Sequence, residues 1–160
     1  MEIRPIDMKK DADAQIVIGH AGFIKSVEDI YEALVGSAPG IKFGIAFIEA
    51  SGPCLVRSEG NDSHLKALAE QNATAIGAGH TFIAIFNNAY PINVNNALKA
   101  VPEVVSIYCS TANPVQVLVS ETNQGAGIVG IVDGSPAKGV ESDEDRDKRK
   151  KLLRDIGYKM

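Results

Sequence analysis

The sequence predicts an α/β fold, in which a mixed sheet of the α+β type is covered by helices in a single compact domain. Apolar runs of strand length alternate with segments whose apolar residues recur at helical spacing. The run at residues 41–50 is apolar on both of its faces, so both faces should be covered. No repeat or linker divides the 160 residues, which suffice for one domain with its own core.

Composition excludes several classes of protein. The formal net charge of −4 argues against non-specific nucleic-acid binding, which requires a concentrated basic face. No apolar segment approaches the roughly 20 residues of a membrane span, and the start lacks the apolar core of a signal peptide. Cys54 and Cys109 match no metal spacing and are expected to be reduced thiols. We therefore expect a cytoplasmic protein with neither nucleic-acid nor membrane partners.

Periodicity and punctuation residues predict the order of the elements. Residues 2–8 suit an edge strand or a lead-in, and strands are expected at residues 15–20, 41–50, 54–58, 82–86, 104–109, 115–121 and 128–132. Ser26, with Asp29 three residues on, should cap a first helix, and Asn61 or Asp62 a second helix that Gly77 ends in a left-handed conformation. Helix-spaced apolar residues then predict a third helix, which we expect Asn93 to cap and Pro102 to end.

Residues 142–157 predict a charged C-terminal helix. Ser142 and Asp145 form a capping-box pattern, and acidic residues precede basic ones, the order that complements the helix dipole. Large apolar residues occur only late, at Leu152, Leu153 and Ile156. The first half of this helix should therefore be solvated and the second half should dock.

The stretch from residue 77 to 114 contains the strongest candidate for chemistry. His80 follows Gly79 and precedes a buried apolar strand. A neutral imidazole can attack phosphorus near neutral pH, and backbone amide groups at glycines can bind phosphate oxygens. The alternative is a hydrogen-bonded structural histidine. His20, between Gly19 and Ala21, has a similar but weaker setting.

Polar residues on the third helix form a second candidate group. Asn96 and Lys99 are three residues apart and should face the same way, with Asn93 one turn earlier. They could contact a ribose or a phosphate, or they could be a cap and a solvated face.

Two further patterns are weaker. The bend at residues 125–127 has glycines but no Walker lysine and no following helix, so it is neither a P-loop nor a Rossmann fingerprint. Three carboxylates near strand ends could hold Mg²⁺ or simply be solvated: Glu103, Glu121 and Asp133.

The combined motifs resemble the adenosine-specific kinase family. They read G-H-x-F, A-Y-P-I-N-V-x-N-A-x-K-x-V-P-E-V, T-A-N-P, Q-G-x-G-I-x-G-x-V-D-G and L-R-x-I-G-Y-K, between about residues 60 and 159. The resemblance implies a compact α/β protein that forms a homotrimer and binds adenosine, AMP, ADP or ATP. It also implies a phosphohistidine intermediate.

The resemblance assigns roles to particular residues. His80 matches the histidine expected to be phosphorylated. The nucleotide-binding residues that it implies are Gly79, Asn93, Asn96, Lys99, Asn113, Pro114 and Asp133. Ala126 stands where an arginine is expected between the two glycines of the bend. Arg57, Lys99 or a residue of a neighbouring subunit would then have to neutralise phosphate, or phosphate would bind more weakly.

Three hypotheses of function follow. The first is a phosphotransferase in which His80 passes a phosphoryl group to adenosine or an adenine nucleotide. The second is a non-catalytic trimer that binds adenine nucleotides as a regulator. The third is a structural subunit whose histidine only makes core hydrogen bonds.

Overall fold

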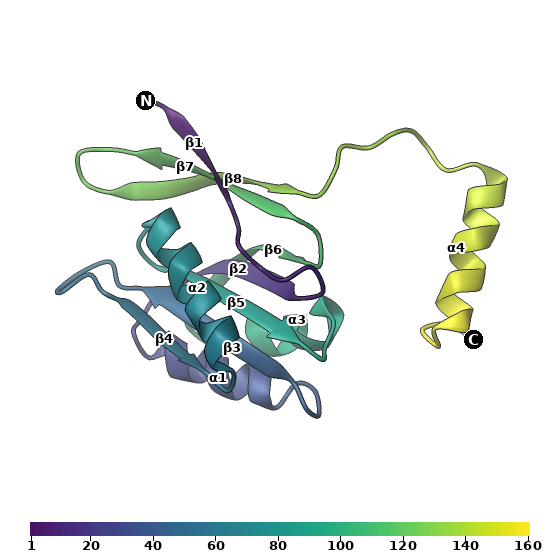
Figure 1. Ribbon diagram of the computed structural model, residues 1–160, viewed down its shortest axis with the longest axis horizontal. Coiled ribbons are helices and arrows are strands. Elements are labelled where there is room, and N and C mark those ends of the chain that lie inside the picture. The colour runs from purple at the N-terminus through teal and green to yellow at the C-terminus, as the bar shows by residue number, and fades with distance from the viewer.

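The computed structural model describes all residues from Met1 to Met160 (Figure 1). The strands are β1 (Ile3–Asp7), β2 (Gln15–Ala21), β3 (Lys42–Ile48), β4 (Val56–Gly60), β5 (Thr81–Asn87), β6 (Val104–Thr111), β7 (Val115–Glu121) and β8 (Ala126–Asp133). The helices are α1 (Ser26–Val35), α2 (Ser63–Ile76), α3 (Pro91–Lys99) and α4 (Asp143–Asp155). Every predicted strand and helix is present, with ends that differ by a few residues.

The strands form two antiparallel sheets rather than one mixed sheet. The larger has the order β4-β3-β5-β2-β6 and the smaller the order β1-β7-β8, and all neighbouring strands in both are antiparallel. Each of the connections through α1, α2 and α3 joins two strands that run the same way, with a third strand inserted between them. A helix that connects two strands usually makes them parallel neighbours in a sheet. Here a third strand lies between the two, and the sequence pattern does not reveal it.

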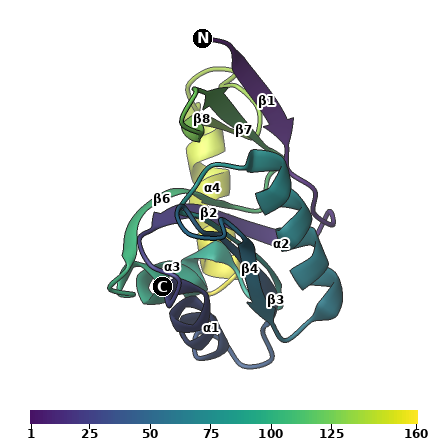
Figure 2. The same cartoon turned by 90° about the vertical axis from the view of Figure 1, so that its left-hand side faces the viewer.

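The larger sheet is covered on both faces, as its two-sided apolar strands predict (Figure 2). On one face, α1 and α3 pack on a cluster that includes Phe43, Phe47 and Phe82. On the other face, α2 and the smaller sheet pack on a cluster that includes Ile48 and Ile83. The protein body therefore has three layers, with the larger sheet in the middle.

Close packing of α2 on β3 requires a glycine. A Cβ added at Gly44 would lie 2.1 Å from the backbone nitrogen of Lys66, well inside van der Waals contact. The absence of a side chain at this position lets the first turn of α2 lie directly on the strand.

Two of the four predicted helix caps are confirmed and two are wrong. Asp62 accepts a hydrogen bond from the Leu65 N–H, and Ser142 forms a capping box with Asp145. Ser26, by contrast, is the first residue of α1 and is fully buried, and α1 has no side-chain cap.

Asn93 lies inside α3, where its side chain accepts a hydrogen bond from the backbone N–H of Tyr90 at 2.8 Å. Pro91, whose φ suits the first helical turn, starts this helix earlier than the asparagine suggests.

The C-terminal helix stands apart from the body (Figure 1). No residue of α4 is buried, and Leu152 and Ile156 are exposed. The prediction that its second half docks is therefore wrong for contacts within one chain.

Candidate functional site

His80 lies at one end of the larger sheet, which we call the His80 end. Here β5 and β6 begin and β2 and β3 end. The loop before His80 starts at Gly77, which ends α2 in the predicted left-handed conformation with φ 64°. His80 itself also has a positive φ, 64°, which is unusual for a residue with a Cβ.

Backbone hydrogen bonds on both sides hold His80 in this conformation. Its N–H donates to the Ile48 carbonyl at 2.8 Å, and its carbonyl accepts from the Ala21 N–H at 2.9 Å. The neighbouring strands β3 and β2 thus hold the backbone between them. A strained conformation that the surrounding structure fixes in this way is typical of a functional position.

The imidazole of His80 is half-buried between two other rings. It stacks on the ring of Phe47, with centroids 5.9 Å apart and an angle of 20° between the planes. The ring of His20 meets it edge to face, with centroids 5.7 Å apart. Burial, and secondarily the nearby His80, lowers the pKa of His20. His20 is therefore mostly neutral at neutral pH, with a free ring nitrogen.

A charged pair follows the end of β3. Glu49 comes directly after Ile48, whose carbonyl accepts the hydrogen bond of the His80 N–H. Glu49 accepts hydrogen bonds from Arg57 at 2.9 and 3.0 Å, and only 11% of its side chain is exposed. The guanidinium of Arg57, one candidate for phosphate, is thus already paired.

A second ion pair lies near the end of β2. Lys25 is 2.9 Å from Glu103 and 3.1 Å from Asp29. The hydrogen bond from Lys25 lowers the pKa of Glu103 and raises that of Lys25. Glu103 Oε2 is buried and has no hydrogen-bond partner. One carboxylate oxygen here can therefore accept a further donor.

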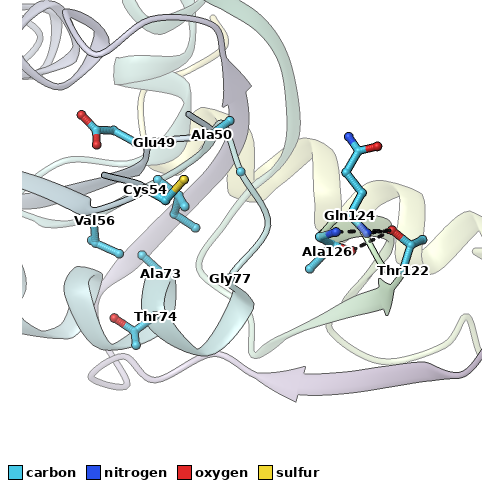
Figure 3. Close-up of a pocket in the computed structure, with 14 residues that line it drawn as sticks. Glu49, Ala50, Cys54, Val56, Ala73, Thr74, Gly77, Thr122, Gln124 and Ala126 are labelled. Atoms are coloured by element: carbon cyan, nitrogen blue, oxygen red, sulfur yellow. Dashed lines mark hydrogen bonds between the residues drawn. The ribbon is translucent and has the colours of Figure 1, made fainter. Parts of the chain in front are cut away.

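The main cavity of the body, about 710 Å³, opens beside the loop that leads to His80 (Figure 3). One wall is formed by the ends of β3 and α2 and the loop after α2, and includes Gly77 and Gly79. The other wall is the β7–β8 turn from Thr122 to Gly127, which an isolated bridge between Ala78 and Ala126 joins to the loop. Glycine backbone and small side chains therefore line much of this space.

The cavity and the His80 ring lie on different faces of the larger sheet. Ile48, Val56 and Ala73 line the cavity and belong to the α2 side, whereas Phe47, which stacks on His80, belongs to the α1 and α3 side. The loop from Gly77 to His80 runs between them at the sheet end. A ligand that reaches both must wrap around this end of the sheet.

Ala126, at the position where an arginine is expected, lines the cavity. No lysine or arginine lines it, whereas the acidic Glu49 does, so only backbone and uncharged polar groups of this cavity could bind phosphate. Lys99 is in the last turn of α3 and makes no ion pair. The chain returns directly from there to Val104, which pairs with Ala21, so Lys99 lies toward the His80 end.

The remaining predicted nucleotide-binding residues lie at the opposite end of the sheet or between the two ends. Asn113 donates to Asp133 at 3.0 Å, and the Pro114 carbonyl accepts from Gly134 at 3.0 Å. This loop follows Thr111, which pairs with Ile16, four residues along β2 from His20. At roughly 3.3 Å a residue, the two ends are about 13 Å or more apart.

The residues on α3 do not form a cluster with His80 either. The helix begins next to the end of β5, so Asn93 is at the opposite end of the sheet, and Asn96 is exposed with no hydrogen bond of its side chain. Within one chain, only Gly79 and His80 of the predicted set are therefore side by side, with Lys99 toward the same end of the sheet.

The predicted carboxylates do not form a metal site. Glu103 pairs with Lys25, Glu121 pairs with Arg4 at 3.0 Å, and Asp133 bonds Asn113. No three histidine, cysteine or acidic side chains are close enough to hold a metal ion. Sequence reasoning also missed the contact of Phe47 and the importance of His20, because strand pairing alone brings both rings to His80.

Comparisons with known proteins were made over the whole chain. The family model described as adenosine specific kinase matches residues 6–159. The crystal structure of the PH1918 protein from Pyrococcus horikoshii OT3 is similar, with 46% sequence identity and a TM-score of 0.96. That match covers 99% of this chain and 98% of the other. A comparison with curated proteins found no match, and none of the helices has the length and apolar character needed to cross a membrane.

Proposed function

Because the chain belongs to the adenosine specific kinase family, we propose that it transfers a phosphoryl group to adenosine or an adenine nucleotide, with His80 as the carrier. The observation that carries this proposal is the imidazole of His80, which backbone hydrogen bonds to two neighbouring strands and the stacked ring of Phe47 hold at the sheet end. The cavity of about 710 Å³ opens on the other face of the sheet, beside the loop that leads to His80. A nucleotide that wraps around the sheet end would bring its phosphate to a nucleophile that is already positioned, and phosphoryl transfer depends mainly on such positioning.

The transfer has two steps. In the first, an imidazole nitrogen of His80 attacks the phosphorus of a donor nucleotide, so that a P–N bond forms and the P–O bond to the leaving phosphate breaks. In the second, an acceptor hydroxyl attacks the phosphorus, its proton passes to a base, and the P–N bond breaks to restore the neutral imidazole. His20, with its lowered pKa and its ring 5.7 Å away, is our candidate for the group that holds this proton.

Cations are needed to offset the charge of the transferred group. Arg57 is held by Glu49, and Lys25 by Glu103 and Asp29. Lys99, which makes no ion pair, is therefore the group that we propose to move to phosphate.

We further propose that the site is completed between copies of a homotrimer. Asn93, Asn113, Pro114 and Asp133 are implied in nucleotide binding by the family resemblance, yet they lie at the end of the sheet opposite His80. A neighbouring copy could present this set to the His80 end. In a closed ring, each of the three interfaces would hold one such site.

A second candidate function is a regulatory trimer that binds adenine nucleotides without turnover. The observation that favours it is Ala126, which leaves the cavity without a cation of its own. Substrate binding would then occur without strong stabilisation of charge in the transition state.

One experiment separates the two candidates. The protein is incubated with adenosine or AMP and an excess of ATP, and products are followed over time. Formation of many equivalents of phosphorylated product per chain supports the phosphotransferase, whereas one equivalent or less of phosphate held on the protein supports the regulator. Nucleotide binding with no phosphate on either the product or the protein would contradict a role for phosphohistidine in both candidate functions.

A further inference from the structure

The last part of the chain, residues 135–160, makes no polar contact with the body. We call this segment the C-terminal arm. Each of its hydrogen bonds and ion pairs joins two residues of the arm, as in the pairs of Glu141 with Arg149 and of Glu144 with Lys148. Figure 1 shows α4 separated from the layers of the body. Nothing in its own chain therefore explains the position of this helix.

The arm nevertheless has the features of a well-defined helix. Its start is closed by the Ser142 capping box, and its end by Gly157, with φ 82°. The Tyr158 N–H donates to the Leu153 carbonyl at 2.9 Å, the hydrogen bond of a Schellman motif. A helix of 13 residues is only marginally stable alone in water, even with good ends. Its stability must come from packing.

The packing surface is on the last turn of the arm. The side chains of Leu152, Ile156 and Tyr158 are 57, 55 and 48% exposed. With Leu153, they place four large apolar residues close together near the end of a helix that is otherwise mostly charged. An apolar group at one end of a charged helix is typical of a helix that docks through that end.

The related crystal structure extends this observation to a second protein. Its match to this chain spans nearly the full length of both proteins with almost complete superposition. The arm is about a sixth of the chain, so the superposition requires the arm to extend in the same direction in that protein. Two chains that differ at about half of their positions thus hold the arm away from their own bodies.

The body has an open apolar edge suited to receive such a helix. β6 is the last strand of the larger sheet, and no strand pairs with its outer edge. At two irregularities in the β2–β6 pairing, Val105 and Tyr108 are left without a partner residue. Their side chains are 73 and 39% exposed. Edge strands of this length are usually covered, and nothing in the same chain covers this one.

We propose that the C-terminal arm is exchanged between copies, with α4 of one chain packing through Leu152, Ile156 and Tyr158 against the open β6 edge of a second copy. Each copy gives one arm and receives one. Such a head-to-tail contact closes into a ring if the rotation between copies allows it. The arm, and not only the body, then holds the assembly together.

The first test disrupts the apolar end of the arm in the full-length chain. The double variant Leu152→Asp, Ile156→Asp is compared with the control Val140→Asp, Met160→Asp, which adds the same charge to the arm at nearly fully exposed positions. Mass is measured by light scattering across a dilution series that begins at micromolar concentration. We expect dissociation of the first variant at a concentration at least about tenfold higher than that of the control. Equal behaviour of the two variants, or a wild type that is monomeric throughout, overturns the proposal.

The second test asks which chain receives the arm. Tyr158 is replaced by the photoreactive residue benzoylphenylalanine, and unlabelled and ¹⁵N-labelled copies are mixed, allowed to exchange and irradiated. We expect cross-linked pairs of hybrid mass, with the cross-link in a peptide that contains β6. Cross-links within one chain overturn the exchange of arms, and cross-links to another part of the second copy overturn the assignment of the β6 edge.

Discussion

The ring of His80 lies nearly parallel to the ring of Phe47, 5.9 Å away, on the face of the sheet opposite the main cavity. Phe47 is fully buried, so one side of the imidazole is dry. A phosphoramidate is protected when water and protons are kept from its nitrogen, because protonation of that nitrogen makes it a good leaving group. The stacked ring thus protects one face of a phosphorylated His80.

The first prediction concerns the carrier itself. His80→Asn keeps a hydrogen-bonding group that tolerates a positive φ, so we expect a folded protein that binds AMP within about tenfold, roughly 1.4 kcal/mol, of the wild type. It should incorporate no phosphate from ATP, as measured by intact-protein mass spectrometry at neutral pH. His64→Asn, at an exposed histidine paired with Asp11, is the control and should behave as wild type. Phosphate on the His80→Asn variant would rule His80 out as the carrier.

The second prediction concerns a site shared between copies. His80→Asn and Asp133→Asn should each abolish or strongly reduce product formation. When the two proteins are mixed and allowed to exchange subunits, some interfaces combine two intact halves, so partial activity should return. Activity that stays at the level of the separate variants, despite exchange shown by mass spectrometry, would mean that each site lies within one chain.

The third prediction concerns the missing cation. Ala126→Arg should place a guanidinium in the cavity and tighten binding of AMP by up to about tenfold, because charge-assisted hydrogen bonds to phosphate are strong. Val129→Arg adds the same charge on the exposed side of β8 and should leave affinity unchanged. If calorimetry shows that the affinity for adenosine rises as much as the affinity for AMP, the added guanidinium does not act on the phosphate.

The fourth prediction concerns pH. Burial lowers the pKa of His20 in the folded protein, so the unfolded chain binds a proton more readily than the folded chain. The stability contributed by neutral His20 is therefore fully present above the unfolded pKa of about 6.5 and declines as pH falls below it. Melting temperature should fall between about pH 7 and pH 5 more steeply in the wild type than in His20→Asn. Parallel curves would show that His20 has no part in this dependence.

The fifth prediction concerns the fold beneath the site. Gly44→Ala places a methyl group against the backbone of α2, and we expect a loss of about 3 kcal/mol in the free energy of unfolding. Gly36→Ala, where the nearest atom would be 3.5 Å away, should change stability far less. Denaturant unfolding measures both, and equal losses would show that α2 can shift to accommodate the methyl group.

The sequence predicted the elements well because each depends on local signals. The two-sided apolar strand around Phe47 indicated a covered sheet, and Asp62 and Gly77 marked the ends of α2 correctly. Ser26 was misread because a buried serine at the start of a helix has the same local pattern as a cap.

The candidate site was predicted only in part, because it depends on strand order. His80 and Gly79 were identified from their own neighbours in sequence. Phe47 and His20 reach His80 through the pairing of β3 and β2 with β5, which no local pattern encodes. For the same reason the Asn113 loop was expected near His80: β5 and β6 run the same way, so the start of one and the end of the other lie at opposite ends of the sheet.

The pairing of β1 with β7 sets the order in which the chain can fold. Ile3 lies opposite Ser120, so the smaller sheet joins the first and last parts of the body. During synthesis, β1 stays unpaired until residue 121, the end of β7, has left the ribosome, whereas β2 to β5 can already pair. We therefore expect a folding intermediate with the larger sheet largely formed and the face beneath the smaller sheet still open to solvent, the state in which this protein is most prone to aggregate.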